Sequence, residues 1–329
     1  MKRIWTAIGL FFLTGTAYLC AETVESLLGK SLDTLHGKEN VRPLVVCFNT
    51  FTYADHGLAS AFSRYLEGSL TLALRQCPQY ELFARDQVER ILEAQQLSLS
   101  DLSSQKDAVR IGRLKSIQAV LSGRFFDAGQ SVEVFLDLTA VETGTVSGSA
   151  KAVIPKALIP AHVALRPDNY TNAVRVLGEL ARVETGGAAP FAVKAWTQRG
   201  DGGAYVDGEN LAVHFLSNAA CYIKMYHIGV DGNMTLIFPN RFQADNRILP
   251  NTVYSVPDAA SGFVFKLAKP YGAEFIKIIA STEQFTTMEP SLDNLGPGSK
   301  ALVTRGLSVQ QREAQMAEVM LSYTILEKK

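Results

Sequence analysis

CYIKMYHIGVDGNMTLIFPN, residues Cys221–Asn240, is the stretch that decides the fold of the second half of the chain. Two apolar-rich segments flank Asp231-Gly232, and an Asp-Gly pair favours the positive φ angles that a tight hairpin turn needs. The second segment ends at Phe238, because Pro239 has no amide hydrogen to donate to a sheet. This stretch therefore predicts a β-hairpin at the centre of a β-rich unit.

Strand-like segments recur on both sides of this hairpin. Leu211, Val213 and Phe215 occupy alternate positions, which is typical of a strand with one buried face. Turn residues separate further apolar runs at intervals of about 8–12 residues, as in a sandwich or compact barrel. The predicted strands are Phe191–Thr197, Val253–Val256, Phe263–Leu267 and Glu274–Ala280. The tail is predicted to form a helix over Ser308–Glu318 and a last strand over Val319–Leu326.

The first half is predicted to be an α/β unit with a mixed sheet and flanking helices. Helical spacing of apolar residues predicts helices over Thr23–His36, Gly57–Gln76, from Asp86 onward and over Lys106–Arg113. Short apolar runs predict the strands Leu44–Phe48, Tyr80–Ala84, Ala119–Phe126, Val132–Ala140 and Thr145–Ile154. Together with the sandwich-like second half, these elements predict the fold class α+β.

The chain has 329 residues, enough for two domains of roughly 100–200 residues each. Hydrophobic residues make up 47 % and charged residues 19 %, so each half can bury a core. Tyr170–Val183 has the pattern of a helix that packs on the first half, and the breaker-rich segment 184–190 follows it. We therefore expect an α/β domain at 22–183, a linker at 184–190 and a β-rich domain at 191–329.

Residues 1–21 have the pattern of a secretory signal. A positively charged start precedes the apolar core Ile4–Leu13 and small residues. This core is too short to span a membrane, and no later segment is long and apolar enough to do so. Cleavage between Ala21 and Glu22 is expected; lipid attachment at Cys20 is the alternative, although Leu19 is bulky for that position. The predicted location is the periplasm or cell envelope, with peripheral or lipid-anchored association with the outer membrane.

Six short motifs of the first half follow one another in a recognisable order. They are LVVCF (44–48), LFARDQV (82–88), ILEAQQL (91–97), IG (111–112), AVLSG (119–123) and VETG (141–144). In this order they resemble the domain shared by the curli secretion channel lipoprotein and flagellar outer-membrane assembly lipoproteins, over about residues 40–155. Channel-forming members of that family carry extra hairpins that build a membrane barrel. The short connections here leave little room for such strands, which need about 10 residues each.

A second resemblance centres on the hairpin. Residues 222–232, LIFPN (236–240), NRI (246–248) and PYGAE (270–274) are similar to an uncharacterised bacterial domain appended to kinases, caspase-like proteases and exported proteins. The likeness covers about residues 191–283. That family carries no assigned activity, so its motif residues are expected to be structural. They are Asp231, Gly232, Leu236, Phe238, Pro239 and Asn240.

The sequence contains no cofactor or metal motif. Lysine plus arginine equals aspartate plus glutamate, 32 against 32, which gives no basis for attraction to nucleic acid. Gly200–Gly203 lacks the Lys-Ser/Thr ending of a phosphate loop and the spaced acids of a calcium loop, so we expect a plain turn. Beyond Cys20, the cysteines Cys47, Cys77 and Cys221 allow at most one disulfide, with Cys47–Cys77 as the open possibility and buried thiols as the simpler one.

The five histidines are scattered through the chain. His214 and His227 lie on predicted strands, and with a carboxylate such as Glu209 they would form the centre of a hydrolase. No nucleophile motif such as Gly-x-Ser-x-Gly accompanies them. Strand-face packing, rather than a ligand platform, is the expected role of the aromatic residues Tyr222, Tyr226, Phe238 and Tyr254.

These features predict a non-catalytic exported envelope protein. It is expected to act by protein–protein interaction in assembly or maintenance of a surface, secretion or flagellar structure. Its expected partners are envelope or surface-structure proteins and not nucleic acid. The first alternative is a periplasmic hydrolase that uses His214, His227 and a nearby carboxylate, and the second is an outer-membrane secretion-channel subunit.

Overall fold

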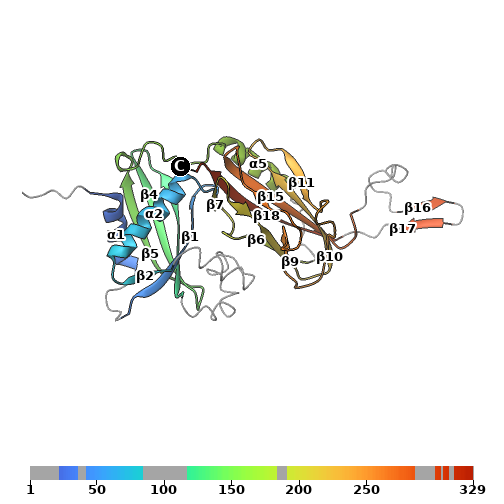
Figure 1. The fold of residues 1–329 in the computed structure, drawn as a ribbon, viewed down its shortest axis with the longest axis horizontal. Helices are drawn as coiled ribbons and strands as arrows, with labels where there is room; N and C mark the ends of the chain where they lie inside the picture. Colours follow the sequence, from blue (N-terminus) through green and yellow to red (C-terminus); the bar gives the residue numbers. More distant parts are fainter. Residues whose placement is uncertain are drawn as a thin grey trace, which may run out of the picture.

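The computed structural model describes residues 22–35, 42–83, 117–183, 191–285, 301–304, 307–310 and 315–328. Figure 1 shows two sheet-containing halves side by side, with the C-terminus between them. Helices and a larger share of strands occur together, which confirms the α+β class. The signal segment, the linker at 184–190 and the helices predicted from Asp86 and over Lys106–Arg113 lie outside the described residues.

A five-stranded mixed sheet of order β2-β1-β3-β4-β5 forms the first half. Strand β1 runs parallel to β2 and β3, whereas β3, β4 and β5 are antiparallel neighbours. The strands are β1 (Leu44–Tyr53), β2 (Tyr80–Leu82), β3 (Ala119–Asp127), β4 (Ser131–Ala140) and β5 (Val146–Pro155). Helices α1 (Val24–Leu35) and α2 (Ala61–Gln76) pack against the sheet, and a short 3-10 turn η2 (Lys156–Leu158) follows β5.

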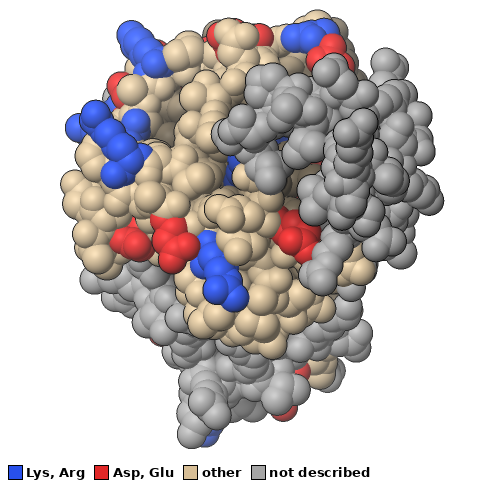
Figure 2. Space-filling model, turned by 90° about the vertical axis from the view of Figure 1, so that its right-hand side faces the viewer, with Lys and Arg blue, Asp and Glu red and all other residues tan. Residues whose placement is uncertain are grey.

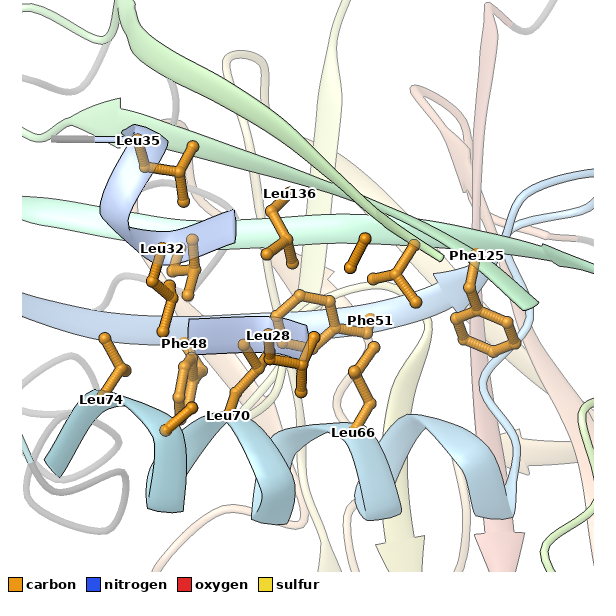
Figure 3. Close-up of a cluster of buried hydrophobic side chains, with 14 of the residues drawn as sticks. Leu28, Leu32, Leu35, Phe48, Phe51, Leu66, Leu70, Leu74, Phe125 and Leu136 are labelled. Atoms are coloured by element: carbon orange, nitrogen blue, oxygen red, sulfur yellow. The ribbon is translucent and has the colours of Figure 1, made fainter. Parts of the chain in front are cut away.

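The core of this half lies between the two helices and the sheet (Figure 3). Helix α2 contributes Phe62, Leu66, Leu70 and Leu74, a stripe at helical spacing with every member buried. Strand β4 buries every second residue, Val132 to Leu138, as the alternating sequence pattern predicts. Burying one such large apolar side chain stabilises a fold by about 1.5–3 kcal/mol, so this layer holds the helices on the sheet.

The second half is a six-stranded sheet that packs with a smaller sheet. The larger sheet has the order β11-β10-β15-β18-β7, with β12 also paired to β10, and the smaller one is β13-β9-β6. The larger sheet contains β7 (Gly203–Val206), β10 (Cys221–Ile228), β11 (Met234–Phe238), β12 (Arg247–Ile248), β15 (Gly272–Ser281) and β18 (Met316–Leu326). The remaining strands are β6 (Val193–Thr197), β8 (Asn210–Leu211), β9 (Val213–Ser217), β13 (Tyr254–Val256), β14 (Phe265–Lys266), β16 (Ala301–Thr304) and β17 (Leu307–Gln310).

The predicted hairpin is present. Strands β10 and β11 pair antiparallel, from Met225 opposite Phe238 to Ile228 opposite Met234. Gly232 in the turn has a φ of 84°, a conformation that residues with a Cβ rarely adopt.

The helix predicted over Ser308–Glu318 is wrong. Residues 307–310 form β17, and β18 already begins at Met316. Strand β18 pairs with β15 along ten residue pairs, from Gly272 opposite Ile325 to Ser281 opposite Met316. Such a long ladder overrides the local helical propensity of this segment. The predicted last strand does close the sheet, because β18 lies between β15 and β7.

Helix α5 (Tyr170–Val183) has the predicted bounds and packs against both halves. Tyr170 contacts Tyr53 and the core of the first half, as predicted, whereas the following turns of the helix pack on β15 of the second half. Ala173 and Val176 contact Phe275 of β15 in a buried apolar cluster that Leu58 of the first half completes. Asn169, just before the helix, donates to the carbonyl of Ala273 and accepts from its amide, both at 2.8 Å. The helix is therefore fixed to β15 by both apolar and polar contacts, although the division into domains stays a prediction.

Candidate functional site

A cleft of about 890 Å³ opens where the two halves meet. Helix α2 and the segment 162–168 supply one wall, and the segments 206–209 and 324–328 supply the other. Its charged lining residues come from both halves and include Arg64, Arg166, Asp168, Lys266, Glu327 and Lys328. Chain segments far apart in sequence form this cleft, so sequence periodicity alone gave no signal for it.

Charges of both signs line this cleft. Arg64, Lys266 and Glu327 are exposed, and within the described residues none of them forms an ion pair. Glu209, in contrast, accepts two bonds from the Arg199 guanidinium, at 2.8 and 3.0 Å. Burial alone would raise the pKa of Glu209. The hydrogen bonds from Arg199 and the Val206 amide, together with the positive charges of Arg199 and Arg64, outweigh burial, so the pKa of Glu209 is lowered. The Glu209 carboxylate is therefore bonded to Arg199 and Val206, whereas the charged side chains of Arg64, Lys266 and Glu327 are exposed to solvent.

An aromatic cluster holds one wall of the cleft in place. The Arg166 guanidinium lies 4.8 Å from the ring centres of both Tyr53 and Tyr170, and it donates to the Tyr53 hydroxyl at 2.6 Å. Nδ1 of His56 and the hydroxyl of Tyr170 are 2.9 Å apart. Because a guanidinium that lies against two aromatic rings gains cation–π attraction from both, Arg166 is positioned by Tyr53 of β1 and Tyr170 of α5 together.

The family-motif residues of the hairpin have structural positions. The Asp231 carboxylate accepts from the Asn233 amide at 2.9 Å, a bond that lowers the pKa of Asp231. Phe238 is buried, and Pro239 follows it through a cis peptide bond. Oδ1 of Asn240 accepts from the amides of Phe242 and Gln243, both at 2.9 Å, and so caps the next turn. Leu236 differs from these, because 44 % of it is exposed.

The histidines predicted for a hydrolase have separate partners. His214 on β9 stacks on Trp196, with ring centres 5.8 Å apart, whereas His227 lies on β10 in the other sheet. Nε2 of His227 is 2.9 Å from Oε2 of Glu274. The carboxylate expected beside the histidines, Glu209, is bonded to Arg199 instead. The predicted constellation is therefore not assembled from those residues.

Glu274 is the site residue that sequence reasoning missed. It is only 5 % exposed, and the Tyr323 hydroxyl donates to the same Oε2 at 2.7 Å. Burial first, and then the charge of Glu274, hold the pKa of Tyr323 well above its usual value. A single acid within the apolar strand GAEFIKIIAS was a usable signal, because buried carboxylates require hydrogen-bond donors.

The remaining predicted sites have ordinary structural positions. Gly200–Gly203 is a turn in which Oδ1 of Asp201 accepts from the Ser322 amide at 2.7 Å, so the loop anchors β18. Cys47, Cys77 and Cys221 are buried thiols, not halves of a disulfide. Tyr254 and Phe238 pack on Phe215. Cleavage at Ala21–Glu22 and lipidation at Cys20 stay predictions.

Two further properties concern metals and membranes. In the part of the chain that the structure describes, no three His, Cys, Asp or Glu side chains are grouped to hold a metal ion. No helix among the described residues is both long and apolar enough to cross a membrane. On the end of the molecule drawn in Figure 2, the visible Lys/Arg and Asp/Glu side chains lie in small separate groups, with no large patch of one sign.

Comparison with known proteins gives one family match. A domain of unknown function (DUF4384) matches residues 204–284, which overlaps the range of the hairpin-centred resemblance. No curated protein matches the chain in sequence. The resemblance of the first half to the curli-secretion and flagellar family stays a prediction.

Several solved structures are similar to part of the chain. The LpoB C-terminal domain from Salmonella enterica has 19 % identity and a TM-score of 0.32, covering 40 % of this chain and 96 % of its own. The corresponding Escherichia coli domain has 17 % identity and a TM-score of 0.32, over 40 % and 95 %. Lipoprotein GNA1162 from Neisseria meningitidis has 15 % identity and a TM-score of 0.28, over 44 % and 100 %. TM-scores this low do not establish a common fold, and the family match covers only part of the second half.

Proposed function

We propose that this chain is an exported, non-catalytic protein of the bacterial cell envelope that acts by protein–protein interaction. Its task is the assembly or maintenance of a surface, secretion or flagellar structure. The secretory pattern of residues 1–21 supports export. The observation that carries the interaction is the cleft between the halves, with its exposed charges of both signs.

The exposed charges of the cleft suit a protein partner. Here Arg64, Lys266, Asp168 and Glu327 present separate charges from both halves to solvent. Such an arrangement complements a polar protein surface of mixed charge, where charge pairs set orientation and exclude wrong partners.

Charge reversal in the cleft tests this proposal. Affinity capture from envelope extracts would compare the wild type with the double variant Arg64→Glu/Lys266→Glu. The matched control is Arg42→Glu/Arg247→Glu, which makes the same charge change at exposed positions outside the cleft lining. We expect a stoichiometric partner that the cleft variant loses and the control keeps. Equal loss or equal retention by both variants would contradict the proposal.

The two alternatives have direct tests of their own. A hydrolase built on His227 and Glu274, which are 2.9 Å apart, requires activity that His227→Ala abolishes without loss of folding. A secretion-channel subunit requires ring-shaped oligomers in detergent extracts. The charged cleft supports a protein partner. Among the described residues, no comparable group of side chains supports either alternative.

A further inference from the structure

We propose that the connection between β1 and α2, residues 57–60, acts as a clip that holds the two walls of the cleft at a fixed separation, so that the cleft is formed before a partner binds. The proposal rests on the protein-binding function proposed above, and it assigns positioning roles to Leu58, Gly202 and Thr324. Two domains of one chain ordinarily move relative to each other unless their interface is large and apolar. In this chain the contacts of the clip oppose such motion.

The clip is fixed to the first half at both ends. The Tyr53 amide of β1 donates to the Leu58 carbonyl at 2.8 Å, and the Gly57 amide donates to the Tyr53 carbonyl at 2.9 Å. At the other end the Ser60 amide donates to Oγ of Ser63, in the first turn of α2, at 2.9 Å. Leu58 is 1 % exposed and Ser60 is fully buried. The clip therefore moves with β1 and α2 as one body.

The side chain of Leu58 packs into the second half. It lies in a buried apolar cluster with Ala173 and Val176 of α5, Ile228 of β10 and Phe275 of β15. Protein interiors are close-packed, so a side chain inserted into such a cluster transmits the position of its own backbone to its neighbours. Leu58 therefore sets where α5 and the larger sheet lie relative to α2.

Strand β18 and the turn before β7 contact the backbone of the clip. The Thr324 hydroxyl donates to the Ala59 carbonyl at 3.1 Å in a buried position. Gly202 approaches the clip so closely that a Cβ there would lie 2.9 Å from the Gly57 carbonyl oxygen. The Gly202 amide also donates to the Ser322 carbonyl of β18 at 2.9 Å, which fixes this turn to the same strand. The second half thus meets the clip at two further points.

The elements that meet at the clip also carry the walls of the cleft. Helix α2 begins at Ala61, directly after the clip, and contributes Ala61 and Arg64 to one wall. Thr324 itself lines the other wall and is followed there by Leu326 and Glu327. Because both walls begin within a few residues of the clip, its contacts fix the separation of Arg64 and Glu327. A site that is already formed loses less conformational entropy when a partner binds.

The separation of the two halves can be measured without a partner. Spin labels on unnatural residues that replace Leu72 of α2 and Val264 of the second half, which are 50 % and 63 % exposed, report it by double electron–electron resonance. The wild type should give one narrow distribution of distances, and a broad distribution would overturn the proposal. Because no partner is present, this result does not depend on the proposed function.

Gly202→Ala tests the close contact with the clip. The added Cβ should push the turn away from Gly57 and shift or broaden the distribution of distances. Gly262→Ala is the matched control, because Gly262 has a φ of 72°, against 73° for Gly202, and nothing lies within 4 Å of a Cβ there. Both variants carry the strain of a left-handed residue, and only Gly202→Ala changes the contact. Equal distributions in the two variants would contradict the proposal.

Leu58→Ala tests the apolar contact. Its control is Leu28→Ala, which removes the same side chain from the core of the first half, where Leu28 is fully buried. We expect a broader distribution of distances in Leu58→Ala alone, and circular dichroism shows whether both variants are folded. If Leu58→Ala does not fold, Thr324→Val takes its place, because it removes only the hydroxyl that bonds the Ala59 carbonyl.

Partner capture tests whether the clip positions the binding site. Affinity capture from envelope extracts should recover less partner with Gly202→Ala than with Gly262→Ala, although both variants keep Arg64 and Lys266. Changed distances with unchanged capture would contradict the positioning role. If the wild type captures no partner at all, the proposed function is wrong, and the measured distances still decide whether the clip holds the cleft.

Discussion

The hydroxyl of Tyr323 on β18 donates to Oε2 of Glu274 on β15 at 2.7 Å, and the two residues stand directly opposite each other in the strand register. Both are buried, and His227 of β10 reaches the same oxygen at 2.9 Å. A buried carboxylate is costly without such partners. The three side chains therefore tie the last strand of the chain to the centre of the second sheet.

Removing the Tyr323 hydroxyl should destabilise the protein. In Tyr323→Phe the buried carboxylate of Glu274 loses one of its donors, which we expect to cost about 1–3 kcal/mol of unfolding free energy. Tyr271→Phe is the matched control, because Tyr271 donates to Asp207 at 3.0 Å in a more exposed setting. Urea unfolding of both variants measures the difference. Equal losses of unfolding free energy in the two variants would show that burial does not strengthen the contribution of the Tyr323–Glu274 hydrogen bond to stability.

Stability should fall at alkaline pH. Burial raises the pKa values of Cys77, Cys221, Tyr80 and Tyr323 above their ordinary values of 9.0 for cysteine and 10.0 for tyrosine. The unfolded chain releases these protons as pH rises through 9 and 10 while the folded chain keeps them. The folded state then binds more protons, so its stability is complete below that range and decreases above it.

Denaturant unfolding at several pH values from neutral to strongly alkaline measures this decline. The variant that tests this explanation is at Tyr80, whose hydroxyl donates to the Leu32 carbonyl at 2.8 Å. Tyr80→Phe removes one titrating group and should make the decline shallower. A decline of unchanged slope in this variant would mean that Tyr80 does not take part.

The contact between α5 and β15 should depend on Asn169. Its amide group bonds both the N–H and the C=O of Ala273, so Asn169→Ala leaves two backbone groups without these partners. We expect a loss of about 1–3 kcal/mol and faster hydrogen exchange of the Ala273 amide. Asn172→Ala, which removes a bond to the Val230 carbonyl, should leave the Ala273 amide protected.

Gly232 should be needed both for the turn conformation and for the close approach of the turn to α5. Its φ is 84°, and a Cβ there would lie 3.2 Å from Cγ2 of Val176 on α5. Gly129 has a φ of 80° with open space around it, so Gly129→Ala measures the conformational cost alone, about 1–2 kcal/mol. Gly232→Ala is expected to cost more in thermal unfolding. Equal costs would mean that the hairpin turn and α5 adjust freely.

Local patterns in the sequence predicted the elements whose own residues determine them. The bounds of α5 and the hairpin at Asp231-Gly232 follow from apolar spacing and turn chemistry. The prediction of a helix in the tail failed because β18 pairs with β15, which is far away in sequence, and this pairing overrides the helical pattern of the segment. The partners of Glu274 and the cleft could not be predicted from the sequence, because they too depend on contacts between distant parts of the chain. Both depend on side chains that only the packed sheets bring together.

Site-specific photo-crosslinking tests the central claim most directly. A photoreactive residue would replace Arg64 in the cleft or, as the control, Leu72, which is 50 % exposed on the same helix α2 but outside the cleft lining. The account predicts a discrete protein adduct in the envelope fraction from position 64 and none from position 72. Recovery of the chain in the cytosol with residues 1–21 still attached, or the same adducts from both positions, would contradict it.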